Sequence, residues 1–189
     1  MSGSRRPEEM AAKTREASDR SFELASDETH SNLSFPAIER IVSGGQTGVD
    51  RGALEAAIQL DLEHGGWCPR GRRAEDGRIP DRYDLRETES ARYDIRTEYN
   101  VVESDATLII HRGPLTSGTA LTRRLAQRRG KPFLLIDLAR PVNVGLIRDW
   151  LARNNVKTLN VAGPRESSAP GIEHDTIRLL VALLTRSRH

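Results

Sequence analysis

Short apolar runs alternate with segments of helical period from Ile38 onward, and this alternation limits the possible folds more than any other feature. Strands that are apolar along their whole length are typical of a parallel sheet covered on both faces. The sequence therefore predicts an α/β fold of the Rossmann-like, doubly wound type, with a mostly parallel sheet of about five strands. The expected strands are Ile38–Val42, Thr107–His111, Pro132–Asp137, Thr158–Ala162 and a shorter one near Gly66–Cys68.

Helical segments are expected between these strands. The first starts near Val49, directly after a glycine loop, where Thr47 and Asp50 are spaced as in a capping box. The second covers Glu89–Glu103, in which apolar residues recur at helical intervals: Ala91, Ile95, Tyr99 and Val102. The others are Thr119–Arg129 with Gly130 as its stop, a helix capped by Asn143, and one over about Asp175–Leu184.

The chain of 189 residues is expected to divide at about residue 36. Residues 1–36 carry five basic and seven acidic side chains and no apolar stripe, which predicts a disordered N-terminal arm. Residues 37–189 form the predicted domain. Within it, the segment His64–Pro80 is rich in Gly, Arg and Pro and is interpreted as a long functional loop.

Composition excludes several classes of protein. The 29 Lys and Arg residues are nearly balanced by 27 Asp and Glu, which leaves a net charge of +2 and does not favour nucleic-acid binding. A single cysteine, Cys68, and the lack of a secretion signal predict a reducing, cytoplasmic location. Since no apolar run approaches the about 20 residues of a membrane span, no association with a membrane is expected.

Three predicted strands end in turns that contain glycine and lead toward helices: Ser43–Arg51, Gly113–Thr119 and Gly163–Ser168. The carboxyl ends of parallel strands meet at one edge of a sheet, where ligands bind. Glycine allows the backbone to approach a ligand closely, and free N–H groups at helix N-termini favour phosphate or another anion. The three loops together predict an anion site, although none has the spacing of a P-loop or of a dinucleotide fingerprint.

Other chemistry finds less support. The five histidines show no paired spacing of metal ligands, which argues against a structural zinc site. Cys68 fits either a small packed side chain or a ligand for a soft metal. Asp50 is a candidate for capping the first turn of its helix, for general-base chemistry or for binding a ribose hydroxyl.

Six segments resemble the circularly permuted YpsA-like members of the SLOG superfamily, which are described as carriers of the molybdenum cofactor. The resemblance covers most of residues 38–185 and lies in Ser43–Leu54, Gly65–Gly77, Arg96–Val101, Ser104–Ile110, Gly118–Thr122 and Asn160–Ser167. It implies that Thr158–Ala162, the last strand of the chain, lies between Ile38–Val42 and Thr107–His111. All three glycine loops would then meet at one site.

The resemblance implies a carrier that binds the molybdenum cofactor, or a related phosphate-bearing pterin, without turnover. It places the phosphate against Gly44, Gly45, Thr47, Gly118, Thr119 and Arg165, and lets Arg70, Arg72 and Arg73 close over the anionic dithiolene. The remaining candidate binding residues are Gln46, Gly48, Asp50, Glu98, Ser117 and Gly163. For Arg165, the alternatives are a pairing with a neighbour such as Glu166 or a hydrated position at the surface.

Relatives in the superfamily include phosphoribohydrolases with a glutamate shortly after their Gly-Thr turn. Thr122 takes that neighbourhood here, so hydrolysis is not expected unless Glu98 acts from another segment. The alternative function is a sensor or enzyme for a nucleotide-derived ligand such as a nucleoside monophosphate. The resemblance further implies a homo-oligomer, dimer or tetramer, and partners among molybdenum enzymes or proteins of cofactor biosynthesis.

Overall fold

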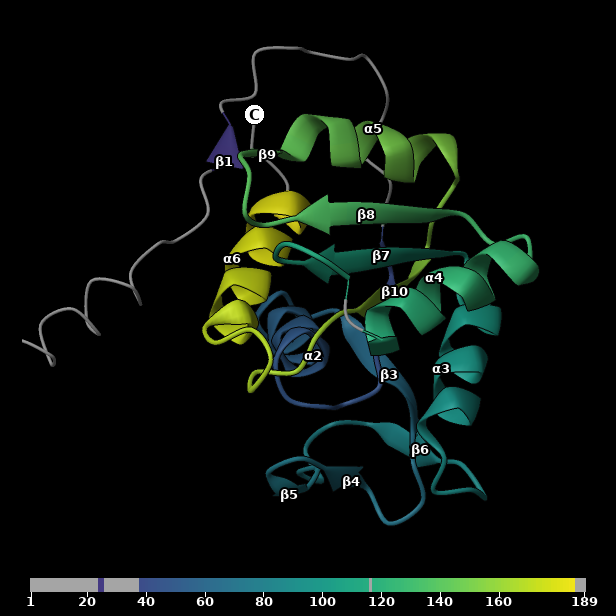
Figure 1. Cartoon of the computed structure of the whole chain (residues 1–189). Helices are drawn as coiled ribbons and strands as arrows, with labels where there is room; N and C mark the ends of the chain where they lie inside the picture. Colours follow the sequence, from purple (N-terminus) through teal and green to yellow (C-terminus); the bar gives the residue numbers. More distant parts are fainter. Residues whose placement is uncertain (1–23, 26–37, 116, 186–189) are drawn as a thin grey trace, which may run out of the picture.

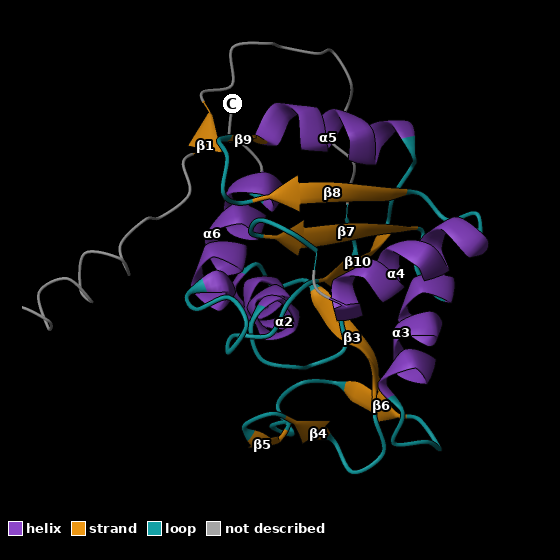
Figure 2. Cartoon of the chain, in the orientation of Figure 1, coloured by secondary structure: helices purple, strands orange, loops and turns teal. Residues whose placement is uncertain are grey.

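The structure is a computed structural model that describes residues 24–25, 38–115 and 117–185. Figures 1 and 2 show a central sheet with helices on both sides. The helices are α2 (Val49–Gln59), α3 (Tyr93–Val102), α4 (Ser117–Arg128), α5 (Val144–Arg153) and α6 (Ile172–Leu184). The strands are β1 (Leu24–Ala25), β2 (Arg40–Val42), β3 (Glu63–Cys68), β4 (Arg73–Ala74), β5 (Gly77–Arg78), β6 (Leu85–Glu87), β7 (Ala106–His111), β8 (Phe133–Asp137), β9 (Val142–Asn143) and β10 (Thr158–Ala162).

The central sheet has six strands in the order β6-β3-β2-β10-β7-β8, and every neighbouring pair is parallel. The predicted α/β fold is confirmed, with one more strand than expected. Strand β10 lies between β2 and β7, with Leu159 opposite Ile41 on one side and Ala106 on the other. The expected permuted strand order is therefore confirmed.

Of the helices in the described residues, three cover one face of the sheet and two cover the other. Helix α6 packs against α2 and α5, while α3 packs against α4 (Figure 1). The main core forms under α2, α5 and α6 and takes Leu159 and Val161 from β10. The opposite face carries a small apolar cluster of Val101, Leu125 and Ala126. Asn160, between the two apolar residues of β10, is buried outside both clusters and donates to Thr107 Oγ1 at 3.2 Å.

The predicted loop His64–Pro80 is wrong in its first part, because β3 extends to Cys68. The rest contains the antiparallel hairpin β4–β5 and is folded around the buried Arg72. The guanidinium of Arg72 donates to four backbone carbonyls, those of Ile79, Pro80, Tyr83 and Leu85. Arg72 is thus a structural centre of this segment.

The helix ends agree only in part with the caps expected from sequence. Asn143 caps α5 by accepting the N–H of Leu146 at 3.1 Å, and Gly130 follows α4 with φ +62°. The capping box of Thr47 and Asp50 is wrong: Gly48 is the N-cap of α2, and no side chain caps this helix. Both side chains instead make contacts outside the helix, described below.

Most of the predicted arm lies outside the described residues, as do residues 186–189. Leu24–Ala25, the described part of it, form β1, which pairs in parallel with β9. Across the described ranges of the chain, no helix is both long enough and apolar enough to cross a bilayer.

Candidate functional site

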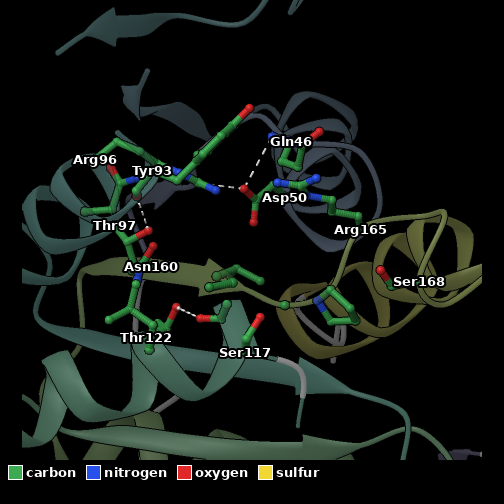
Figure 3. A pocket seen from close by; sticks show the side chains of 18 residues that line it. Gln46, Asp50, Tyr93, Arg96, Thr97, Ser117, Thr122, Asn160, Arg165 and Ser168 are labelled. Carbon is green, nitrogen blue, oxygen red and sulfur yellow. Dashed lines mark hydrogen bonds and ion pairs between the residues drawn. The ribbon is translucent and has the colours of Figure 1, made fainter. Parts of the chain in front are cut away.

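A pocket of about 360 Å³ opens where the carboxyl ends of β2 and β10 face α3 and α4 (Figure 3). The loops after β2 and β10 and the first turns of α2 and α4 supply part of its wall. The inner side of α3 supplies the rest. The lining residues are Gly44, Gln46, Asp50, Tyr93, Arg96, Thr97, Asn100, Ser117, Gly118, Leu121, Thr122, Asn160, Val161, Ala162, Gly163, Pro164, Arg165 and Ser168.

The first and third glycine loops touch each other beside this pocket. Gly48 has φ +77°, and a Cβ there would lie 2.6 Å from the carbonyl oxygen of Pro164 and 2.6 Å from the amide nitrogen of Glu166. The N–H of Val49 donates to the same Pro164 carbonyl at 3.2 Å. A side chain at position 48 would force the two loops apart, so glycine is required for their contact.

Arg96 crosses the pocket wall from α3 to reach Asp50 on α2. Its Nη1 donates to Asp50 Oδ2 at 2.8 Å, and the two side chains are 15% and 5% exposed. The guanidinium passes directly over Gly44, and a Cβ on Gly44 would overlap it. Gly44 therefore serves the site by leaving room for an ion pair between two helices.

Asp50 presents one used and one unused oxygen. Its Oδ2 accepts both Arg96 and the backbone N–H of Gln46, the latter at 3.3 Å. Its Oδ1 has no hydrogen-bond donor among the described residues, and Figure 3 shows the carboxylate directed into the pocket. Two buried nitrogens beside it, Gln46 Nε2 and Arg96 Nε, also have no partner in the described part of the chain. Unpaired buried groups of this kind are uncommon in folded proteins and indicate a site for a ligand or water.

The outer part of the pocket is cationic and aromatic. The ring of Tyr93 lies close to two guanidinium groups, with its centre 5.3 Å from Cζ of Arg165 and 5.9 Å from Cζ of Arg96. Arg165 is exposed and makes no ion pair within the described residues, so the alternative pairing with Glu166 is not observed. Glu166 instead accepts the N–H groups of Gly171 and Glu173.

The first turn of α4 provides a second favourable feature for an anion. Ser117 and Gly118 line the pocket at this helix N-terminus, and the first turn contains no acidic residue. Free N–H groups and the positive end of the helix dipole favour a negative charge at this position.

Glu75, at the turn of the β4–β5 hairpin, ties the hairpin to two of the glycine loops. Its carboxylate accepts the hydroxyl of Thr47 and both the N–H and the hydroxyl of Ser167, the N–H at 3.2 Å. Burial alone would raise the pKa of Glu75, but the hydrogen bonds from Ser167 and Thr47 and the charge of Arg165 hold this pKa below its usual value. The hairpin is thus held by an anionic carboxylate next to the pocket.

Comparison with known proteins agrees with this fold. Residues 41–184 match the model of the circularly permutated YpsA SLOG family. This chain belongs to that family. A crystal structure of the "Putative molybdenum carrier protein" from Syntrophus aciditrophicus is similar to this chain, with 46% sequence identity and a TM-score of 0.77. That match covers 79% of this chain and 97% of the other. A search among curated proteins gave no match.

About half of the site residues expected from the SLOG resemblance line the pocket. They are Gly44, Gln46, Asp50, Ser117, Gly118, Gly163 and Arg165. Gly45 lies next to it but faces Leu85 and Ile79, while Thr47 is engaged by Glu75 and Gly48 by the loop after β10. Thr119, in the first turn of α4, is buried but does not line the pocket.

The remaining expected residues lie outside the pocket in this SLOG domain. Arg72 is buried among carbonyl groups, and Arg70 and Arg73 are exposed and do not line the pocket. Glu98 forms an ion pair with Arg129 on the outside of α3 and α4. A lid made of the three arginines would require movement of the segment that contains them.

Four lining residues from α3 were missed by sequence reasoning: Tyr93, Arg96, Thr97 and Asn100. The residues at apolar spacing on this helix drew attention instead, yet Tyr99 is 44% exposed and Val102 is 41% exposed. Asn100 is buried and exchanges hydrogen bonds with the backbone of Trp67 at 2.7 and 3.0 Å. The available signal was the spacing of Arg96 and Asn100, which puts both on one face of the helix. Leu121, Thr122, Asn160 and Ser168 also line the pocket and were not among the expected residues.

Two remaining alternatives concern metals. No group of three or more His, Cys, Asp or Glu side chains suited to a metal ion occurs in the described part of the chain. Cys68 is fully buried in an apolar cluster with Leu54, Ile79, Tyr83 and Leu85. Burial raises the pKa of its thiol, so the thiol is protonated and packed as a small apolar group.

Proposed function

We propose that this protein binds the molybdenum cofactor, or a closely related phosphate-bearing pterin, and carries it without chemical turnover. The observation that carries the proposal is the convergence of three glycine loops, an unpaired arginine and a helix N-terminus on one pocket. A volume of about 360 Å³ suits a ligand of that size. The description of the related bacterial protein as a molybdenum carrier supports this cargo.

The phosphate is assigned to the side of the pocket formed by α4 and the loop after β10. Gly118 and Gly163 bring backbone close to this position, and Ser117 and Ser168 offer hydroxyl groups. Arg165 supplies a fork of N–H donors that matches phosphate geometry. No carboxylate is among the residues that line this side of the pocket, and the nearby carboxylate of Glu75 is occupied by hydrogen bonds from Thr47 and Ser167.

Binding of the ligand without hydrolysis is supported by the positions of Thr122 and Glu98, neither of which supplies a glutamate carboxylate to the pocket. Thr122 stands in the neighbourhood of the relatives' glutamate, and its hydroxyl donates to the carbonyl of Gly118 at 3.3 Å. Glu98, the other candidate, faces away from the pocket toward Arg129. The pocket carboxylate Asp50 is fixed by Arg96 and the Gln46 amide.

A rival function is a sensor of, or enzyme for, a nucleotide-derived ligand. The free oxygen of Asp50 favours it, because a buried carboxylate can accept a ribose hydroxyl. Both candidates use the same phosphate position, so they differ in the ring that the pocket accepts.

Native mass spectrometry of the protein purified from a host that makes the molybdenum cofactor tests the proposal. We expect a bound mass equal to that of the cofactor, absent when the host lacks cofactor synthesis. A bound nucleotide in both hosts would support the rival. Protein that emerges free of any ligand from the producing host, and takes none up from a cofactor-loaded donor protein, would contradict both.

We further propose that the protein is a homo-oligomer that meets donors and recipients of the cofactor, molybdenum enzymes or biosynthetic proteins. On α3, Tyr99 and Val102 are 44% and 41% exposed and Ile95 is half-buried, so this apolar stripe offers an interface. A monomer mass by light scattering at micromolar concentration would contradict this assembly.

A further inference from the structure

On the side of the pocket opposite α4, a carboxylate oxygen of Asp50 accepts no hydrogen bond from any described residue. Asp50 is 3% exposed as a residue, lines the pocket, and has one oxygen that no described residue engages. Figure 3 shows Asp50 across the pocket from Ser117, on the side of Arg96 and Gln46. A ligand with its phosphate at α4 would therefore bring its other end toward Asp50.

The ion pair with Arg96 fixes the direction of this acceptor. Oδ2 already accepts two donors, one from Arg96 at 2.8 Å and one from the Gln46 amide at 3.3 Å. Both of its lone pairs are in use, while both lone pairs of Oδ1 are available. Arg96 is thus a positioning residue, and Gly44 allows it to reach this place.

The chemistry of a lone carboxylate oxygen discriminates between heterocycles. A 2-amino-4-oxo pyrimidine ring, as in a pterin or guanine, presents a ring N–H beside an exocyclic amino group, so it offers adjacent donors. Adenine and cytosine present an acceptor ring nitrogen beside their amino group, and an acceptor facing a buried carboxylate is disfavoured.

We infer that Asp50 Oδ1 receives the N–H donors of an amino-oxo ring edge, so that the pocket selects pterins and guanine over other nucleobases. The inference rests on the proposed function, because it takes the phosphate position as the other anchor. It adds a specificity-determining residue and a class of ring. It also narrows the rival function, since a nucleotide in this pocket would be a guanylate.

Guanosine and inosine 5′-monophosphate form a matched pair of probes, because they differ by the exocyclic amino group and carry the same charge. Calorimetric titration of the full chain should give a dissociation constant about 10-fold or more lower for guanosine monophosphate. In Asp50→Asn the ratio of the two constants should fall close to 1. The ratio is the correct readout, since removal of a negative charge changes the affinity of both phosphates equally.

Arg165→Ala is the matched control, because it removes a contact to the phosphate and none to the ring. Both nucleotides should bind it more weakly with their ratio unchanged. A ratio near 1 in the wild-type protein, a ratio that survives in Asp50→Asn, or no binding of either nucleotide would overturn the inference. The ratio for the wild-type protein can be measured even if a variant does not fold. The carrier function is tested separately, by the cofactor-loading experiment.

Discussion

The face of the sheet under α2, α5 and α6 is packed with aliphatic side chains, whereas the face under α3 and α4 is apolar only in part. Leu159 and Val161 of β10 point to the first face, and Asn160 between them points to the second. The three-helix face buries a continuous core, while the two-helix face encloses a small cluster and the pocket. Stability and ligand binding are thus assigned to opposite sides of the same strands.

Helix α3, on the pocket side of the sheet, turns polar side chains inward and leaves some apolar side chains exposed. Its buried side carries Arg96 and Asn100, and its exposed side carries Tyr99 and Val102. Burying polar groups is unfavourable unless they are hydrogen-bonded, and here the Trp67 backbone and Asp50 satisfy most of them. Helix α3 therefore contributes polar side chains to the pocket and one fully buried apolar side chain, Val101, to the small cluster.

The largest effect is expected from a truncation in the three-helix face. Leu179→Ala in α6 removes a fully buried side chain and should lower the free energy of unfolding by about 2–5 kcal/mol. Leu121→Ala on the pocket face removes the same atoms from a partly buried position and should cost about half as much or less. Equal losses in urea denaturation of the two variants would contradict the comparison.

Arg165→Ala tests the pocket face without touching the core. The loss of charge-assisted hydrogen bonds worth about 1.5–3 kcal/mol should weaken guanosine monophosphate binding roughly 10- to 150-fold. Arg165→Lys should recover only part of the affinity, because an ammonium lacks the fork of a guanidinium. Since Arg165 is exposed, thermal unfolding should be unchanged in both variants. Wild-type affinity in the alanine variant, measured by calorimetry, would remove Arg165 from the site.

Gly44→Ala should affect both stability and ligand binding, because its new methyl group would occupy the position of the Arg96 guanidinium. Arg96 must then leave Asp50, and overpacking of this kind typically costs about 1–3 kcal/mol of stability. Gly118→Ala is the matched control, since a Cβ at Gly118 meets nothing within 4 Å. Denaturant unfolding should separate the two, and an unaffected Gly44→Ala protein would show that Arg96 can be placed elsewhere.

The smallest effect is expected for Glu75→Gln in the hairpin. The pKa of Glu75 is lowered in the folded state, so its carboxylate contributes stability above its usual pKa of about 4.5. That contribution disappears as the pH falls through the lowered value. For an exposed group it should amount to less than about 1 kcal/mol at pH 7. Urea denaturation should show wild type and variant converging as the solution is acidified, and a constant difference down to pH 3 would contradict the assignment.

The main features of the fold follow from the short apolar runs of the sequence. Four strands of the central sheet, β2, β7, β8 and β10, were predicted from such runs. The sixth strand, β6, was missed because it has three residues and only Leu85 is buried. The position of β10 came from the family resemblance, since strand order is not encoded in local periodicity. In both cases the missing information was a contact between segments distant in the chain.

The site was predicted to the extent that its residues follow strands. Gly44, Gly118, Gly163 and Arg165 could be placed at the sheet edge from their position after or between strands. Arg96 and its ion pair with Asp50 could not, because 46 residues separate the partners. Apolar spacing on α3 indicated a face that the structure leaves exposed, since the pocket takes the polar face inward.

Strand β10 occupies the middle of the sheet, yet it is the last of the six central strands to leave the ribosome. Until residues 158–162 have been synthesised, β2 and β7 each have an open inner edge, and unpaired edges of this kind promote aggregation. The nascent chain therefore needs β10 both to close the sheet and to complete the pocket. A product of interrupted translation that ends before β10 lacks Asn160, Gly163 and Arg165 as well as the strand that joins the two halves of the sheet, so it cannot form the complete pocket.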